Sequence, residues 1–75
     1  MLNVEVFPNP ANDVLTINMN DLESVRLLDM MGRIVLSESV RKNTHQLNVQ
    51  GLASGMYVLQ ATSKHQLWNK RLLVK

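Results

Sequence analysis

Hydrophobic and polar positions alternate along most of the chain with a period of two. Within residues 14–19, for example, Leu15, Ile17 and Met19 share one face, while polar side chains occupy the other. This period is that of a half-buried β-strand and differs from the 3.6-residue period of a helix. The alternation predicts seven short strands, at residues 4–7, 14–19, 25–27, 33–38, 44–49, 56–62 and 67–74.

Turn-forming residues separate these stretches. Neither proline of Pro8-Asn9-Pro10 can donate a backbone hydrogen bond, so this segment cannot lie in a central strand. Asp29 and Gly32 suit the first and fourth positions of a type I turn, with Gly32 as the left-handed residue of a hairpin bulge. Residues 51–55 indicate a loop, and residues 63–66 the last hairpin turn. Turn signals about every 8–12 residues, with no convincing helix, predict an all-β antiparallel sandwich.

The same alternation predicts which side chains form the core. We expect the centre of the core to contain Leu15, Ile17, Leu27, Ile34, Leu36, Leu47, Tyr57 and Leu59. Met19 and Met56 are expected to fill the remaining space, whereas Met30 and Met31 fall at an exposed turn. Tyr57 and Trp68 are expected to anchor the core, although aromatic rings can also stack on a sugar.

Length and composition limit what the chain can do. Its 75 residues are 45% hydrophobic and 19% charged, which fits one small globular domain. A chain this short buries only about 60% of its unfolded surface, so there is little room for an enclosed catalytic pocket. No apolar run reaches the roughly 18–20 residues of a membrane span, and residues 1–5 do not resemble a signal peptide.

Charge argues against nucleic-acid binding. The net charge is +2, and the basic residues are scattered, with the densest group near the end of the sequence. A nucleic-acid-binding protein usually carries a tighter basic stripe and more exposed aromatic residues, and its affinity falls steeply with salt.

The residues that usually carry out catalysis or bind metals form no known pattern. There is no cysteine, and the six carboxylates form no acid/base pair; Asp13, Asp21 and Asp29 fall at predicted turns. His45 and His65 stand apart, so we expect surface-facing histidines and not a zinc site. Ser54 lacks the first glycine of a nucleophile elbow, and no phosphate-binding glycine loop is present. We therefore expect no catalysis, no cofactor and no metal.

Four segments, taken in order, carry a resemblance to a known family. They are Pro8-Asn9-Pro10 before a strand, residues 25–35 around the Asp29–Gly32 turn, Gly55-Met56-Tyr57, and the basic closing stretch 70–75. No one of these motifs is specific, but the ordered set covers essentially the whole chain. The chain resembles the type A C-terminal sorting domain of proteins exported by the type IX secretion system of Bacteroidetes.

The resemblance implies a secretion signal. Members of that family end large secreted enzymes and adhesins and direct them, after Sec-dependent passage to the periplasm, through the outer-membrane translocon to the cell surface or medium. A sortase-like protease then commonly removes the domain. The family fold is an immunoglobulin-like β-sandwich of about seven strands. Residues 1–75 are then a single domain and a fragment of a larger protein, with Met1 at a fragment boundary and the cleavage site upstream of Pro8.

Matched position by position, the resemblance also implies a set of translocon-recognition residues. They are Pro8, Asn9 and Pro10 in the opening motif, Gly55 and Tyr57 in the G-x-Y motif, and Lys70, Arg71, Leu72, Val74 and Lys75 in the basic terminal strand. Purely structural roles remain open for these positions: Asn9 can fix a turn, Gly55 can supply an unusual backbone angle, and Tyr57 can belong to the core.

The terminal strand gives the sharpest hypothesis. Trp68, Leu72 and Val74 can face the core while Arg71 faces outward. At a sheet edge the strand would offer backbone groups to an added strand of the translocon, with Lys70, Arg71 and Lys75 fixing the register. The alternative from another class is an immunoglobulin-like module that binds carbohydrate or protein for a secreted enzyme.

Overall fold

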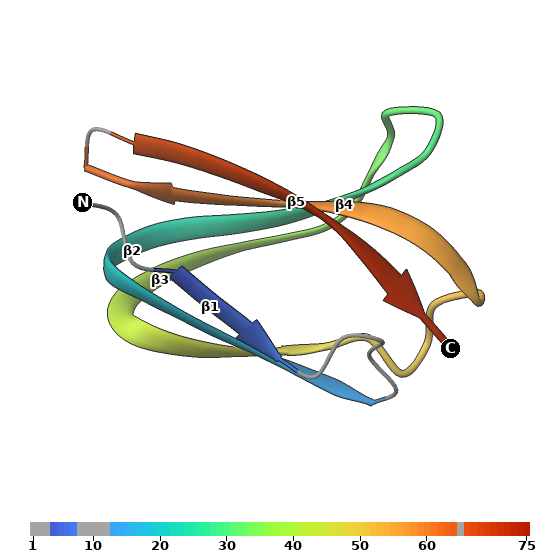
Figure 1. Ribbon diagram of the computed structural model, residues 1–75, viewed down its shortest axis with the longest axis horizontal. Helices are drawn as coiled ribbons and strands as arrows, with labels where there is room; N and C mark the ends of the chain where they lie inside the picture. The colour runs from blue at the N-terminus through green and yellow to red at the C-terminus, as the bar shows by residue number, and fades with distance from the viewer. Residues whose placement is uncertain (1–3, 8–12, 65) are drawn as a thin grey trace.

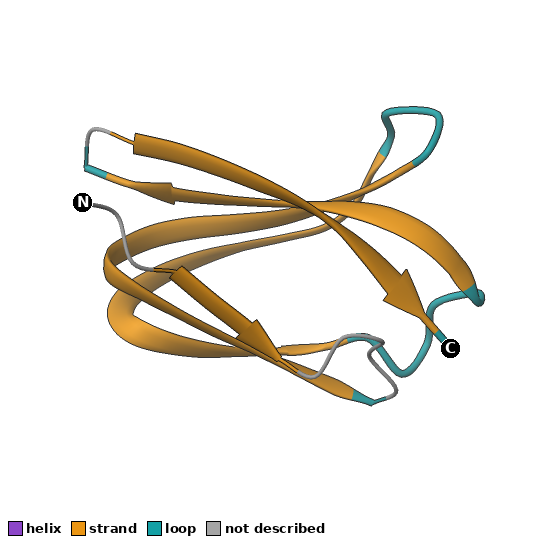
Figure 2. Cartoon of the chain, in the orientation of Figure 1, coloured by secondary structure: helices purple, strands orange, loops and turns teal. Residues whose placement is uncertain are grey.

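The computed structural model describes residues 4–7, 13–64 and 66–75, and within these ranges the chain is all β (Figures 1 and 2). Its strands are β1 (Val4–Phe7), β2 (Val14–Asp29), β3 (Ile34–Asn48), β4 (Gly55–Ser63) and β5 (Gln66–Val74). Met1, the Pro8-Asn9-Pro10 motif and His65 lie outside the described residues. None of the described ranges contains a helix, so none contains a helix able to cross a bilayer.

The described residues form five strands and not the predicted seven, because two of the strands are long and bent. Residues 14–19 and 25–27, expected as separate strands, are the two halves of β2. Residues 34–38 and 44–48 are likewise the two halves of β3. The alternation therefore located the strand-forming stretches, but the polar segments between them continue as strand and do not form loops.

The bent strands fold one antiparallel sheet back on itself. β3 pairs with β2 along its length, while the other side of β2 pairs first with β1 and then with β4, which pairs with β5. A three-stranded layer (β1 and halves of β2 and β3) thus faces a four-stranded layer (β4, β5 and the other halves), as Figure 1 shows. One curled sheet takes the place of the two separate sheets expected for the sandwich.

The bend has a local cause in the middle of β2. Asp21 has a φ of 56°, a left-handed value that Asp tolerates better than most residues. The register between β2 and β3 shifts between Asn18 and Leu22 and again before Ser24. Such irregularities bend a strand and increase its twist. The backbone N–H of Asp21 donates to Oδ1 of Asn43 at 3.0 Å, which ties the bend of β2 to that of β3.

The core fills the space between the two layers. Of the eight predicted central residues, Leu15, Ile17, Leu27, Leu47, Tyr57 and Leu59 are buried, and Leu36 is half-buried. The core also contains residues from both halves of the bent strands and from the terminal strand, namely Met19, Leu22, Val25, Val40, Val49, Ala61, Leu72 and Val74.

Two core predictions are wrong, and both concern the outer face of the four-stranded layer. Ile34 pairs with Leu28, and the register shift between Leu27 and Leu28 turns Ile34 outward while Leu36 still faces inward. Met56 lies between the glycine that begins β4 and the buried Tyr57, so the pleat also turns it outward. Both side chains are exposed.

The β2–β3 hairpin has the turn that the sequence predicts. The N–H of Gly32 donates to the carbonyl oxygen of Asp29 at 3.0 Å, and Gly32 has a φ of 85°. The N–H of Asp29 donates to the carbonyl oxygen of Arg33, which closes the bulge. Met30 and Met31 are exposed at the turn, as expected.

Candidate recognition surface at the terminal strand

The sheet places two of the three predicted recognition motifs side by side. In the β4–β5 pair, Gly55 lies opposite Val74 and Tyr57 lies opposite Leu72. The G-x-Y motif and the basic terminal strand are therefore one structural unit. The third motif, Pro8-Asn9-Pro10, lies outside the described residues.

Within this unit, Gly55 and Tyr57 have structural tasks. Gly55 has a φ of 154°, which residues with a side chain rarely adopt, although a Cβ there would meet no heavy atom within 4 Å. The ring of Tyr57 is buried, and its hydroxyl donates to the carbonyl oxygen of Ala53 at 2.7 Å. This bond holds the loop before β4 against the strand, in the manner of the tyrosine corners of β-sandwiches.

The terminal strand β5 is an edge strand within the described chain. It pairs with β4 on one side, and no other described strand pairs with it. Leu72 and Val74 are buried, so their side chains support the fold and are not available to a partner. The exposed members of the predicted set in this strand and just after it are Lys70, Arg71 and Lys75.

Lys70 and Arg71 point to opposite sides of the sheet. Lys70 is opposite the buried Leu59, so it starts from the core face of β5 and reaches solvent at the open edge of the sandwich. Arg71 is opposite Val58 on the outer face. A lysine on the inner face of an edge strand hinders unselective pairing with other strands.

The carboxylates of the described residues that form ion pairs do so away from this strand. Asp29 accepts hydrogen bonds from the backbone of Met31 and Arg33 at 2.9 and 3.0 Å, and its Oδ2 lies 2.9 Å from Nε of Arg33. These bonds, led by the one from the Arg33 backbone, hold the pKa of Asp29 below its ordinary value. Glu38 pairs with His45. Neither pair includes Lys70, Arg71 or Lys75.

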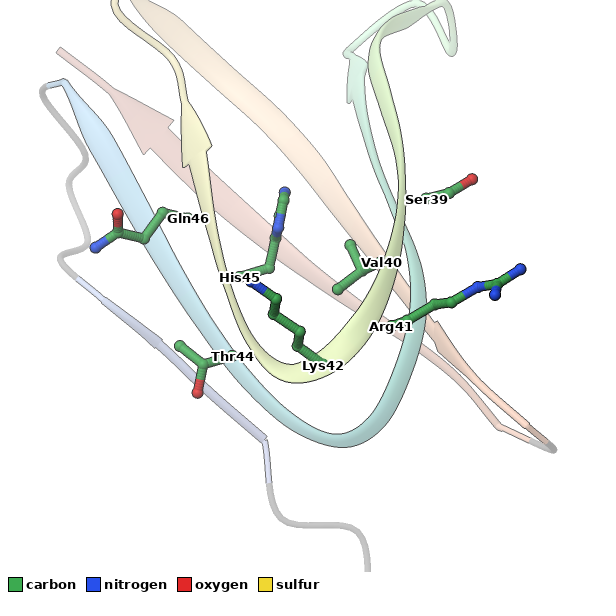
Figure 3. Close-up of a pocket in the computed structure, with 7 residues that line it drawn as sticks. All are labelled: Ser39, Val40, Arg41, Lys42, Thr44, His45 and Gln46. Carbon is green, nitrogen blue, oxygen red and sulfur yellow. The ribbon is translucent and has the colours of Figure 1, made fainter.

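The sequence predicts that His45 faces the surface, and the structure contradicts this prediction. It lies opposite the buried Ile17 and is half-buried on the inner side of the β3 bend, where Glu38 contacts it. This bend encloses a hollow of about 590 Å³ (Figure 3). Figure 3 shows Val40 and His45 extending into the bend, while Arg41 and Gln46 extend away from it.

The hollow does not assemble a reactive or metal-binding centre from the described side chains. No group of three or more His, Cys, Asp or Glu residues gathers within residues 4–7, 13–64 and 66–75. In the lining of the hollow, residues 39–42 and 44–46, the Thr44 hydroxyl bonds to Asn18 and His45 pairs with Glu38, so these two side chains are not paired as nucleophile and base. The terminal strand and its neighbours thus remain the best candidate site in the described part of the chain.

The sequence did not identify the outer face of the four-stranded layer as a candidate surface. Ile34 and Met56 were assigned to the core, yet they lie outward beside Leu28 and Val58. The run Ile34-Val35-Leu36 is apolar at every position, so alternation alone cannot tell which residue faces inward. The β-bulge between β2 and β3 determines which of these residues faces inward, and the bulge is defined only by the pairing of the two strands.

Comparison with known proteins identifies a family. The model of the secretion system C-terminal sorting domain matches residues 5–75 of this chain. An endo-acting ulvan lyase of Formosa agariphila is 33% identical over 96% of the chain, and a β-agarase D of Zobellia galactanivorans is 32% identical over 79% of it. The chain spans only 15% and 12% of the length of these two relatives.

A solved structure shows the same fold. That solved structure is of PorZ, which is described as an essential bacterial surface component of the type IX secretion system of Porphyromonas gingivalis. It superposes with a TM-score of 0.78 and 24% sequence identity. The match covers 97% of this chain and 11% of the PorZ chain. At this identity the likeness concerns the fold.

Proposed function

The chain belongs to the family of secretion system C-terminal sorting domains, which are non-catalytic secretion signals, and we propose that it directs a larger cargo protein through the type IX outer-membrane translocon. The family match over residues 5–75 carries this proposal. The small share of each relative that the chain spans is consistent with a terminal module of a much longer protein. The likeness in fold to part of PorZ, a type IX component, supports the assignment to that system.

The route follows from this function. The cargo crosses the periplasm, reaches the cell surface or medium, and loses the domain to a sortase-like protease. The relatives that the chain matches include a lyase of ulvan and a β-agarase. A cargo that acts on polysaccharides outside the cell would need such a route, because the enzyme must reach its polymeric substrate outside the cell.

We assign recognition to the part of the β5 edge that runs from Gln66 to Leu72. An extended segment of the translocon adds a strand there, and main-chain hydrogen bonds supply most of the affinity. Lys70 and Arg71 lie on opposite faces of β5, so together with Lys75 they fix the register of the added strand. Because backbone groups are shared by all sequences, this mode suits a receptor that accepts many different cargoes.

The competing carbohydrate-binding role has less support. Tyr57 is buried and Trp68 is half-buried on the core face of β5. Neither ring offers the open platform on which a sugar stacks.

The experiment uses a periplasm-targeted reporter fused to the chain, in a host that has this secretion system. The test variant is Lys70→Ala/Arg71→Ala/Lys75→Ala, whose side chains are exposed, and thermal melting checks that it folds. A matched control removes three cations away from the edge: Arg33→Ala/Arg41→Ala/Lys42→Ala. We expect the test variant to accumulate in the periplasm and the control to be exported.

A second variant lacks residues 72–75. This truncation also removes the buried Leu72 and Val74, so it tests the whole strand and not its charges. If the folded triple variant is exported as well as the unaltered fusion, the proposed charge contacts between β5 and the translocon are refuted. If the truncated fusion reaches the cell surface, the translocon does not recognise β5.

A further inference from the structure

The two outer faces of the sandwich differ in character. The outer face of the three-stranded layer is mostly polar: Glu5, Thr16, Asn18, Thr44, Gln46 and Asn48 share it by register, with Phe7 and Val14 at one end. Its side chains also bond to one another, since the hydroxyl of Thr44 donates to Oδ1 of Asn18 at 2.8 Å. This is the pattern of a sheet surface that faces water.

The outer face of the four-stranded layer is apolar and cationic at the end near the β2–β3 turn, and it becomes polar from the row of Arg26 onward, where Ser37, Gln60 and Asn69 lie. We call the apolar and cationic end the Arg26–Arg71 face, formed by Arg26, Leu28, Ile34, Met56, Val58 and Arg71. Strand pairing sets Ile34, Leu28, Val58 and Arg71 in one row across β3, β2, β4 and β5. Ile34 and Met56 are 53% and 42% exposed. Exposed apolar side chains gathered on one sheet face, unlike scattered ones, mark a contact surface.

The charges on this face are unbalanced. Arg26 and Arg71 project from it beside the apolar row, and register places no carboxylate of the described strands among its outward positions. Asp29, next to Leu28 at the end of β2, is already bound to Arg33 and to the turn backbone. The complement of this face is therefore an apolar centre bordered by carboxylates.

We propose that the Arg26–Arg71 face is a second contact surface, which binds a cell-envelope protein whose own surface has an apolar centre flanked by carboxylates. This inference rests on the proposed sorting function and adds a partner to it. A second copy of the chain does not fit, because a two-fold contact would bring arginines against arginines.

A protein is also favoured over a lipid surface. The face carries arginine and methionine, which are enriched in protein interfaces, and lacks lysine, which is depleted there. Lys42 and Lys64 line a hollow near the bends of β2 and β3, and Lys70 starts from the core face of β5.

The experiment compares matched pairs of reporter fusions in a secretion-competent host. Arg26→Glu reverses a charge of the face that does not belong to β5, and Arg41→Glu makes the same change in charge at the β3 bend. Met56→Ser removes an exposed apolar side chain from the face, and Val14→Ser removes one of similar exposure, 41%, from the opposite layer. The substituted positions lie outward or at the bend, and melting curves confirm folding.

We expect the two face variants to be exported about tenfold less than their controls, the usual effect of losing a well-packed interface side chain. Export of a folded Arg26→Glu fusion at the level of the Arg41→Glu fusion overturns the second surface and leaves the sorting function standing. Failure of the unaltered fusion to be exported overturns the sorting function itself, and the second surface with it.

Two further measurements separate the other occupants. Sedimentation of the unaltered chain should show a monomer; a dimer that Arg26→Glu dissociates would mean that a second copy covers the face. Vesicles of anionic phospholipid should not bind the chain through this face; binding that the same variant abolishes would assign the face to lipid and overturn the proposal.

Discussion

Tyr57 and Leu72 lie directly opposite each other on β4 and β5, and both are buried. The pair joins the G-x-Y motif to the terminal strand, so these two motifs are linked by packing before any partner binds. The side chains of this pair hold β4 and β5 together from within the core, while Lys70 and Arg71 of β5 are exposed. The division separates structural from recognition roles and leads to tests of each.

Removing the Tyr57 hydroxyl should loosen the loop before β4. Tyr57→Phe keeps the buried ring but deletes the 2.7 Å bond to the carbonyl oxygen of Ala53. We expect a loss of about 0.5–1.5 kcal/mol in unfolding free energy. Urea denaturation measures it, and hydrogen exchange should rise in residues 50–54. An unchanged midpoint would contradict the role given to the hydroxyl.

Gly55 should be required for its backbone angle and not for lack of space. Its φ is 154°, and a Cβ at this position would meet no heavy atom within 4 Å, so Gly55→Ala should destabilise the domain by about 1–3 kcal/mol through backbone strain alone. Gly51→Ala is the control, because Gly51 has equal space and no such φ. That change should be neutral or slightly stabilising. Equal effects of the two substitutions would refute the argument from φ.

The alternation of the sequence predicted the strand-forming stretches because a half-buried sheet imposes a period of two. It could not predict that residues 20–24 and 39–43 continue as strand, because the bend depends on the left-handed Asp21 and on pairing between β2 and β3. The outward turn of Ile34 has the same origin in a register shift.

The candidate site could be predicted only in part for a related reason. Sequence identified Lys70 and Arg71, but which strand lies at an edge, and which face each cation leaves from, follow from the order of strands in the sheet. That order is set by contacts between residues far apart in the chain.

Core packing should limit stability. Leu59 is fully buried between the layers, so Leu59→Ala should cost about 2–5 kcal/mol, a large share of the stability of a small domain. Leu67→Ala, at a position 61% exposed in β5, is the control and should change the unfolding free energy by less than about 0.5 kcal/mol. Similar losses at both positions would contradict the assigned core.

Asp29 should make the hairpin sensitive to acid. Its pKa in the folded state lies below the ordinary value of 3.8, chiefly because the Arg33 backbone bonds to the carboxylate. The stabilisation is therefore complete above pH 3.8 and is lost as the pH falls through the lower folded-state pKa. The stability difference between the unaltered chain and Asp29→Asn should shrink over that acidic range. NMR titration of Asp29 at or above pH 3.8 would contradict this.

The central claim is that this chain is a sorting signal for the type IX pathway. The most direct test is the fraction of a periplasm-targeted reporter found outside the cell, with and without the chain fused to its carboxyl terminus, in a secretion-competent host and in the same host lacking the translocon. The account predicts export of the fused reporter in the competent host alone, with the unfused reporter periplasmic in both. Equal extracellular fractions of fused and unfused reporter, or export of the fusion without the translocon, would contradict it.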